Sequence, residues 1–182
     1  MESKIKSIIL IGFIQLIGLL IIRSSTNDTV SFMGYHGYKL GNRTVLIKPI
    51  EGTVIITDQK EIEEYIDSDR YIYFAIIGDS LHSDYPKVSA DHLKMGTIDT
   101  IEKLVDLLEQ DTTITIIDRQ VSDRSLIIRQ KKYDDELDET NYMIARYIDC
   151  YPYYLRLIHV WKDTETAPPK LFEILSSVGT NK

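Results

Sequence analysis

Residues 71–81 read Tyr-Ile-Tyr-Phe-Ala-Ile-Ile-Gly-Asp-Ser-Leu, and this stretch is the clearest indication of the fold. Its first seven residues are all apolar or aromatic, and Gly78 and Asp79 end the run abruptly. A run of this length is typical of a central β-strand that is buried on both faces. In α/β sheets, ligands usually bind beside the loop that follows such a strand. Residues 78–92 are therefore the first place to expect a functional site.

The segment before this strand predicts two further strands and a helix. Residues 44–48 and 53–57 are rich in β-formers and are separated by the turn-forming tetrapeptide 49–52, which predicts a hairpin. Asp58 has a glutamate three residues later, the pattern of a helix N-cap, and predicts a short helix over 59–67. A helix between two strands implies that the strands are parallel and joined by a right-handed crossover.

The rest of the chain continues the alternation of strands and helices. Its patterns predict, in order, a helix over 98–109 with Thr97 as N-cap, strands over 113–118 and 126–131, a helix around 143–148, a strand over 153–161, and a helix from Pro168 to a C-cap at Gly179. The predicted fold class is therefore α/β or α+β, a mixed β-sheet covered by helices.

Composition restricts the classes of partner. The chain has 182 residues, a formal net charge of -7 and a pI near 5.1. An acidic surface repels phosphate groups, so nucleic acid and anionic lipid headgroups are excluded as main partners. The single cysteine, Cys150, cannot form an intrachain disulfide and is expected to be a small buried apolar residue.

Residues 7–22 form an uncharged, largely apolar run between Lys6 and Arg23. A helix of this length would measure about 24 Å, which suits a bilayer with local thinning. We expect residues 1–26 to be a signal anchor or a signal peptide, and a buried core helix is the third alternative. The preceding lysines favour the cytoplasm, so residues 27–182 are expected to form a single extracytoplasmic α/β domain. The protein is then a single-pass membrane protein, or secreted if cleaved near residue 26.

Residues 78–81 spell Gly-Asp-Ser-Leu, the block for which the GDSL hydrolases are named. With the apolar run before it, this block resembles the strand and nucleophile segment of that family. The resemblance implies that Ser80 is a nucleophile and that backbone N–H groups around it form an oxyanion hole. The family's C-terminal Asp-x-x-His and its Gly-x-Asn-Asp block are absent, and the histidines after residue 82 are His92 and His159. A serine esterase that uses Ser80 and His159 is therefore the alternative prediction.

A second resemblance concerns the fold. Residues 54–58, 62–66 and 71–77 are similar to the opening of a thioredoxin-like domain, and the pattern over 113–149 is similar to its second half. Where redox members of that family carry Cys-x-x-Cys, this chain has no cysteine. Thiol–disulfide exchange is therefore excluded, and the resemblance implies a non-catalytic binding version of the domain.

Two segments that contain several acidic residues or histidines are candidates for metal sites. His82, Asp84, Asp91 and His92 follow the predicted strand and could supply ligands to a divalent metal, but their spacing is not specific for one. The acidic run over 134–139 lacks the spacing and the glycine of an EF-hand, and is interpreted as a helix N-terminus. No metal and no other cofactor is predicted.

The C-terminal third is rich in aromatic residues that carry a polar group, among them Tyr151, Tyr153, Tyr154 and Trp161. Such residues are enriched at protein–protein interfaces, and core packing is the other explanation. We predict that these four residues bind a protein partner. The leading functional prediction is a non-catalytic binding or accessory domain, held at a membrane through residues 7–22 or exported.

Overall fold

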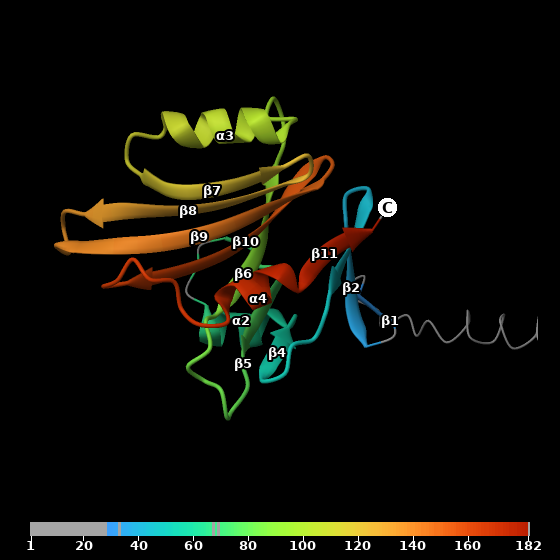
Figure 1. The fold of residues 1–182 in the computed structure, drawn as a ribbon. Helices are drawn as coiled ribbons and strands as arrows, with labels where there is room; N and C mark the ends of the chain where they lie inside the picture. Colours follow the sequence, from blue (N-terminus) through green and yellow to red (C-terminus); the bar gives the residue numbers. More distant parts are fainter. Residues whose placement is uncertain (1–28, 33, 67, 69, 182) are drawn as a thin grey trace, which may run out of the picture.

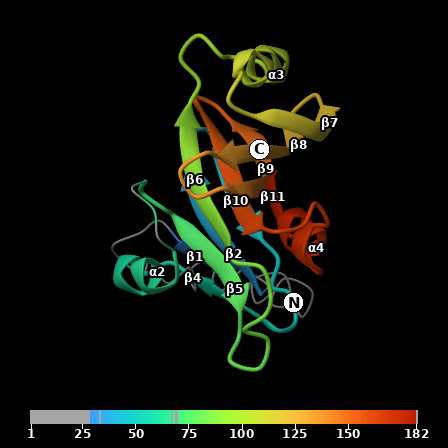
Figure 2. The same ribbon diagram turned by 90° about the vertical axis from the view of Figure 1, so that its left-hand side faces the viewer.

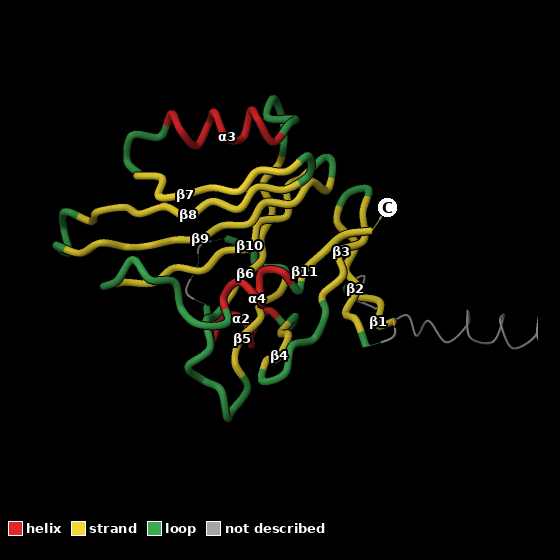
Figure 3. The backbone as a smooth tube through the Cα atoms, viewed as in Figure 1, coloured by secondary structure: helices red, strands yellow, loops and turns green. Residues whose placement is uncertain are grey.

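The computed structural model describes residues 29–32, 34–66, 68 and 70–181. These residues form eleven β-strands and three α-helices, and strands occupy much more of the trace than helices do (Figure 3). Every strand pairing among the described residues is antiparallel. The expectation of a β-sheet packed against helices is confirmed, but both sheets are antiparallel and not mixed, and the arrangement is α+β because the helices do not link parallel strands.

The larger sheet has seven strands in the order β4-β5-β6-β10-β9-β8-β7 (Figure 1). Their bounds are β4 Thr53–Ile56, β5 Phe74–Gly78, β6 Val88–Lys94, β7 Thr115–Ser122, β8 Ser125–Asp134, β9 Glu139–Cys150 and β10 Tyr153–Lys162. Strands β7 to β10 form a meander, and β10 also pairs with β6. β10 therefore joins the two halves of the sheet.

The smaller sheet has four strands in the order β1-β2-β3-β11 and lies beside the larger one (Figure 1). Its bounds are β1 Thr29–Phe32, β2 Tyr35–Leu40, β3 Arg43–Ile47 and β11 Val178–Asn181. The last strand pairs with β3, and Val178 lies opposite Ile47. The two ends of the described chain are thus held in one sheet.

Three helices are described: α2 (Gln59–Tyr65), α3 (Ile101–Gln110) and α4 (Leu171–Ser176). The predicted N-cap of α2 is confirmed, because the Asp58 carboxylate accepts hydrogen bonds of 3.1 Å from the N–H groups of Lys60 and Glu61. The predicted helix over 98–109 is also confirmed, although its N-cap is Thr100 and not Thr97.

The two faces of the larger sheet are covered by different elements (Figure 2). One face packs against α4 and the smaller sheet in a cluster that includes Phe74 and Leu157. The other face packs against α3 through Leu104 in one cluster and against α2 through Ile62 in another. These two clusters are separate, and the paired residues Asp91 of β6 and Arg156 of β10 lie on this face, because Arg156 alternates with Leu155 and Leu157 of the first cluster.

The prediction of parallel strands around α2 is wrong. β4 and β5 are antiparallel neighbours, with Thr53 opposite Gly78. α2 has seven residues and so measures about 10 Å, which is too short to return the chain along a strand. β5 is buried on both faces as expected, but it is the second strand from the edge and not a central one.

The predicted helix around 143–148 is also wrong, because this segment belongs to β9. Both faces of β9 are buried, so apolar residues occur in pairs that imitate helical spacing. The acidic run 134–139 contains the turn between β8 and β9.

The predicted hairpin over 44–57 does not form, because β3 and β4 belong to different sheets. The predicted C-cap at Gly179 is also wrong, because Gly179 lies in β11. The similarity to a thioredoxin-like domain depended on these elements, and the observed topology does not support it.

Candidate binding pocket

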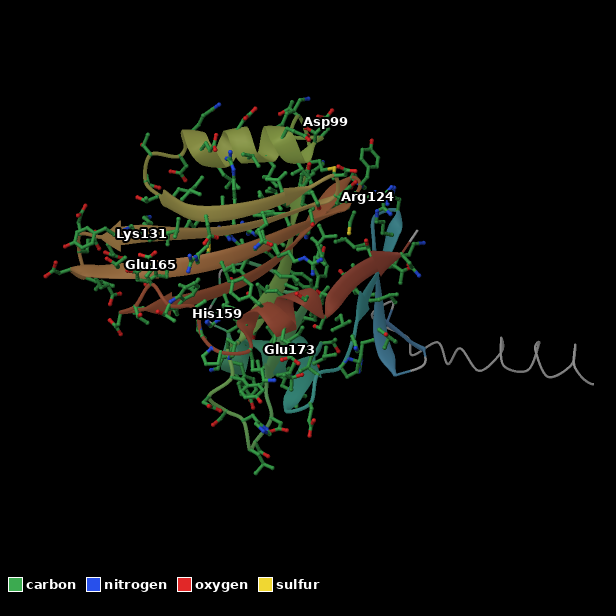
Figure 4. All side chains as sticks on the ribbon, in the orientation of Figure 1. Asp99, Arg124, Lys131, His159, Glu165 and Glu173 are labelled. Atoms are coloured by element: carbon green, nitrogen blue, oxygen red, sulfur yellow. The ribbon has the colours of Figure 1, made fainter. Side chains whose placement is uncertain are left out.

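A pocket with a volume of about 570 Å³ lies beside α2, between the loop that leads into β6 and the second half of β10. This volume is within the range of small-ligand sites. His159 lines the pocket and is seen on β10, close to the segment that leads into α4 (Figure 4). The polar side chains in the lining are Ser68, Arg70, Asp84, Lys87, Ser89 and Asp91. Most of them fall within residues 78–92, where a site was expected from the sequence.

A buried ion pair lies at the pocket. Asp91 lines the pocket, is 3% exposed, and accepts hydrogen bonds from Arg156 Nε at 2.8 Å and Nη2 at 2.6 Å. The two residues lie directly opposite each other on β6 and β10. Side chains of opposed residues on antiparallel strands share one face of the sheet, so the register itself brings the two charges together.

Burial of the Asp91–Arg156 ion pair is costly in free energy. Taking both charges out of water costs several kcal/mol per ion, and only good geometry offsets the cost. Arg156 meets Asp91 through two parallel bonds, which is the favourable arrangement. A second cation, Arg70, lies on the solvent side with Nη1 3.9 Å from Asp91 Oδ2. Charged groups retained in a cleft are candidates for binding.

His159 forms part of the pocket wall. Its Nδ1 lies 2.9 Å from the backbone carbonyl oxygen of Lys87, so Nδ1 carries the proton and donates. Its Nε2 is buried and has no hydrogen-bond partner among the described residues. Burial lowers the pKa of His159, and the bond to the Lys87 carbonyl opposes this change. The ring stacks on Trp161, with centroids 5.8 Å apart, which fixes its orientation.

The Gly-Asp-Ser-Leu block forms a tight turn after β5. The carboxylate of Asp79 accepts hydrogen bonds from the N–H groups of Leu81 and His82, and His82 Nδ1 lies 2.8 Å from the same oxygen. This side-chain bond from His82 is the main reason that the pKa of Asp79 is lowered. The block therefore has a clear structural role in which Asp79, and not Ser80, is the organising residue.

Ser80 is exposed, and no described histidine is hydrogen-bonded to it. His159, the base in the alternative prediction, is bonded to Lys87 instead, and His92 lies in an aromatic cluster with Tyr73 and Tyr153. The structure therefore does not assemble Ser80 and His159 into a hydrogen-bonded pair. A hydrolase that uses Ser80 stays a prediction.

The four aromatic residues predicted to bind a partner lie in different places. Tyr154 is 1% exposed and packs in the core below α3, whereas Tyr151 is 60% exposed beside the turn that starts β10. Tyr153 lies 4.8 Å from the ring of His92, and Trp161 lies at the other end of β10, stacked on His159. Eight residues of extended strand separate these ends by about 26 Å, so the four side chains do not form one surface.

The candidate metal ligands of residues 82–92 do not form a metal site either. Within the described residues, no group of three or more histidine, cysteine, aspartate or glutamate side chains is placed to hold a metal ion. His82 is paired with Asp79, Asp91 with Arg156, and His92 with aromatic rings. Cys150 is buried, as expected, and burial raises the pKa of its thiol to about 11.

Sequence reasoning missed Arg70, which lines the pocket, and Arg156, which is hydrogen-bonded to the pocket residue Asp91. Arg156 alternates with apolar residues along β10, and a charged residue within an otherwise apolar strand was the available signal. Comparisons with protein-family models and with curated proteins find no match to this chain. No helix within the described residues is long and apolar enough to cross a bilayer, and the predicted anchor at 7–22 lies outside those residues.

Proposed function

We propose that the described domain is a non-catalytic binding domain and that its ligand occupies the pocket beside α2. The observation that supports this proposal most is Asp91, a buried carboxylate that lines a pocket of about 570 Å³ and is held in place by Arg156. The two groups are fixed by strand register and not by a loop, so the acceptor is preorganised for a ligand. We further propose that residues 7–22 hold this domain at a membrane or direct its export, with the domain on the extracytoplasmic side.

Binding is favoured over catalysis because none of the described residues that line the pocket is an activated nucleophile. Ser89 lines the pocket, but no described histidine or carboxylate is hydrogen-bonded to it. His159 donates its Nδ1 proton to a carbonyl oxygen and so lacks the carboxylate that orients a catalytic histidine. The esterase alternative is tested separately: loss of p-nitrophenyl acetate hydrolysis in a Ser80→Ala variant would favour it over binding.

The binding proposal is tested with three probes of one shape and different charge: benzamidine, benzamide and benzoate. Ligand-observed saturation-transfer NMR on the full chain measures their affinities. The Ser89→Phe variant fills the pocket from β6, and Ile158→Phe fills it from β10. Ser176→Phe is the matched control, because Ser176 is exposed at the end of α4 and does not line the pocket.

We expect at least one probe to bind saturably to the wild-type chain and to the Ser176→Phe variant. Both pocket-filling variants should lose this binding by about tenfold or more, because an aromatic ring occupies the volume that the probe needs. Thermal unfolding of each variant checks that it is folded. If no probe binds, or if binding survives in the folded pocket-filling variants, the proposal is wrong.

A further inference from the structure

Two groups of the pocket, the Asp91 carboxylate and the Tyr65 ring, each lie near a cationic side chain of the protein. Arg70 Nη1 lies 3.9 Å from Asp91 Oδ2, and Lys87 Nζ lies 5.7 Å from the centroid of the Tyr65 ring. All four residues line the same pocket. A carboxylate and an aromatic face both attract cations. The pocket therefore has the chemistry of a cation site.

Both contacts are loose. A distance of 3.9 Å is beyond hydrogen-bond length, and the side chain of Arg70 is 62% exposed. The 5.7 Å separation of Lys87 and Tyr65 is near the outer limit of a cation–π contact, and both residues are exposed. Contacts of this kind contribute little to stability, so a ligand can displace these side chains into solvent.

Asp91 can accept further hydrogen bonds. An ionised carboxylate has about four acceptor positions, and Arg156 uses two of them. Arg70 is too distant to use another. An ammonium or guanidinium at hydrogen-bond distance from Asp91 would gain a charge-assisted bond that Arg70 does not make. Because the ligand takes the place of Arg70, the number of charges near Asp91 does not change.

The remaining walls indicate what carries the cation. Ile72, Met143 and Ile158 line the pocket, so the part of a ligand that follows its charged end meets apolar side chains. The net charge of -7 attracts cations toward the protein. We propose that the pocket binds an ammonium or guanidinium group carried on an apolar body, and that this group replaces Arg70 beside Asp91. This inference rests on the binding function proposed above.

The three probes test the sign of the charge. Benzamidine carries a planar cation, benzamide is its neutral counterpart, and benzoate is the anion. We expect benzamidine to bind about tenfold or more tightly than benzamide, because a charge-assisted bond to a buried carboxylate separates them. Benzoate should bind most weakly. Benzamide that binds as well as benzamidine would overturn the inference while leaving the pocket as a binding site, and so would a preference for benzoate.

Substitutions then test the position of the cation. Asp91→Asn should remove the preference for benzamidine over benzamide. Arg70→Ala should raise the affinity for benzamidine about threefold, because a competing cation is removed. Arg124→Ala is the control, since Arg124 is exposed and outside the pocket. Weaker benzamidine binding in Arg70→Ala would overturn the inference, and this variant carries the test if Asp91→Asn does not fold.

The source of the cation is distinguished with two peptides, acetyl-Leu-Arg-Leu-amide and its citrulline counterpart, which differ only in charge. Arginine-dependent binding of the peptide that Ser89→Phe abolishes would identify a basic side chain of a protein partner. If benzamidine binds as predicted but neither peptide does, the ligand is a small free cation. The cation site stands in both cases.

Discussion

Gly78 illustrates how the absence of one side chain shapes the loop after β5. A Cβ atom at this position would lie 1.6 Å from the backbone carbonyl oxygen of His82. The turn that contains Asp79 can close against the strand only because no side chain intervenes. The Gly-Asp pair of the sequence motif is therefore explained by packing, without any catalytic role for the serine that follows.

We predict that Gly78→Ala destabilises the fold by about 3 kcal/mol or more, because a backbone atom must move to relieve the overlap. Gly179→Ala is the matched control: no atom lies within 4 Å of a Cβ there, and its cost should stay within about 0.5 kcal/mol. Urea unfolding measures both. Equal free energies of unfolding for the two variants would show that the turn is not as tight as described.

His159 makes stability depend on pH. Burial holds its pKa below the ordinary value of 6.5, so the unfolded chain takes up the proton first as the pH falls. The stability that the neutral ring contributes is present above pH 6.5 and is lost as the pH falls from there through the folded-state pKa. We predict that His159→Phe, which keeps a ring against Trp161, reduces the loss of stability between pH 7.5 and pH 5. Urea midpoints at several pH values test this, and an unchanged pH dependence would assign the effect to other groups.

The Asp91–Arg156 pair should behave as one unit. Asp91→Leu or Arg156→Met alone leaves one buried charge without its partner, and we expect each to cost about 3–5 kcal/mol. The double variant should cost much less than the sum, with a coupling energy above about 1 kcal/mol. A double-mutant cycle by urea unfolding measures this energy. Additive effects would mean that the two side chains act independently.

At the scale of elements, α3 is held to the larger sheet by one apolar face. Leu104 is completely buried in the cluster with Leu126 and Ile128, whereas Leu107 is 46% exposed. We predict that Leu104→Ala costs about 2–5 kcal/mol and that Leu107→Ala costs less than about 1 kcal/mol. Both changes remove the same atoms from the same helix. Similar costs in chemical denaturation would mean that α3 is not packed through this face.

The helix α2 was predictable from its N-cap, and α3 was predictable from its apolar face, although the N-cap of α3 is Thr100 and not Thr97. β9 was not predictable, because burial on both faces gives Met143, Ile144, Tyr147 and Ile148 a spacing that a helix also produces. Strand order was not predictable either. β5 looks central by its length and apolar content, yet its neighbours are set by contacts far apart in the sequence.

Contacts between strands that are far apart in the sequence also explain why only part of the candidate site was predictable. Residues 78–92 were singled out because they follow a buried strand, and Asp91 lies among them. Its partner Arg156 is 65 positions away in the sequence, and only the pairing of β6 with β10 brings them together. The aromatic residues near the C-terminus were recognised by type, but alternation along β10 sends neighbouring side chains to opposite faces.

At the scale of the whole molecule, the two sheets and three helices of the described residues place one pocket wall on the larger sheet, and they place the other wall on α2 and the loop that leads into β6. The wall on the sheet carries the Asp91–Arg156 pair, and the opposite wall carries exposed side chains such as Lys87 and Tyr65. This division suits a binding domain, in which a fixed acceptor meets a ligand while exposed cations move aside.

Cysteine protection tests most directly whether this pocket is the ligand site. Cys150, the single cysteine of the chain, is buried, so a Ser89→Cys variant has one reactive thiol, and it lies in the pocket. We predict that saturating benzamidine slows alkylation of this thiol by iodoacetamide about tenfold and leaves Ser83→Cys, an exposed position outside the pocket, unaffected. Alkylation of Ser89→Cys at an unchanged rate under saturating benzamidine would contradict the assignment of the pocket as the binding site.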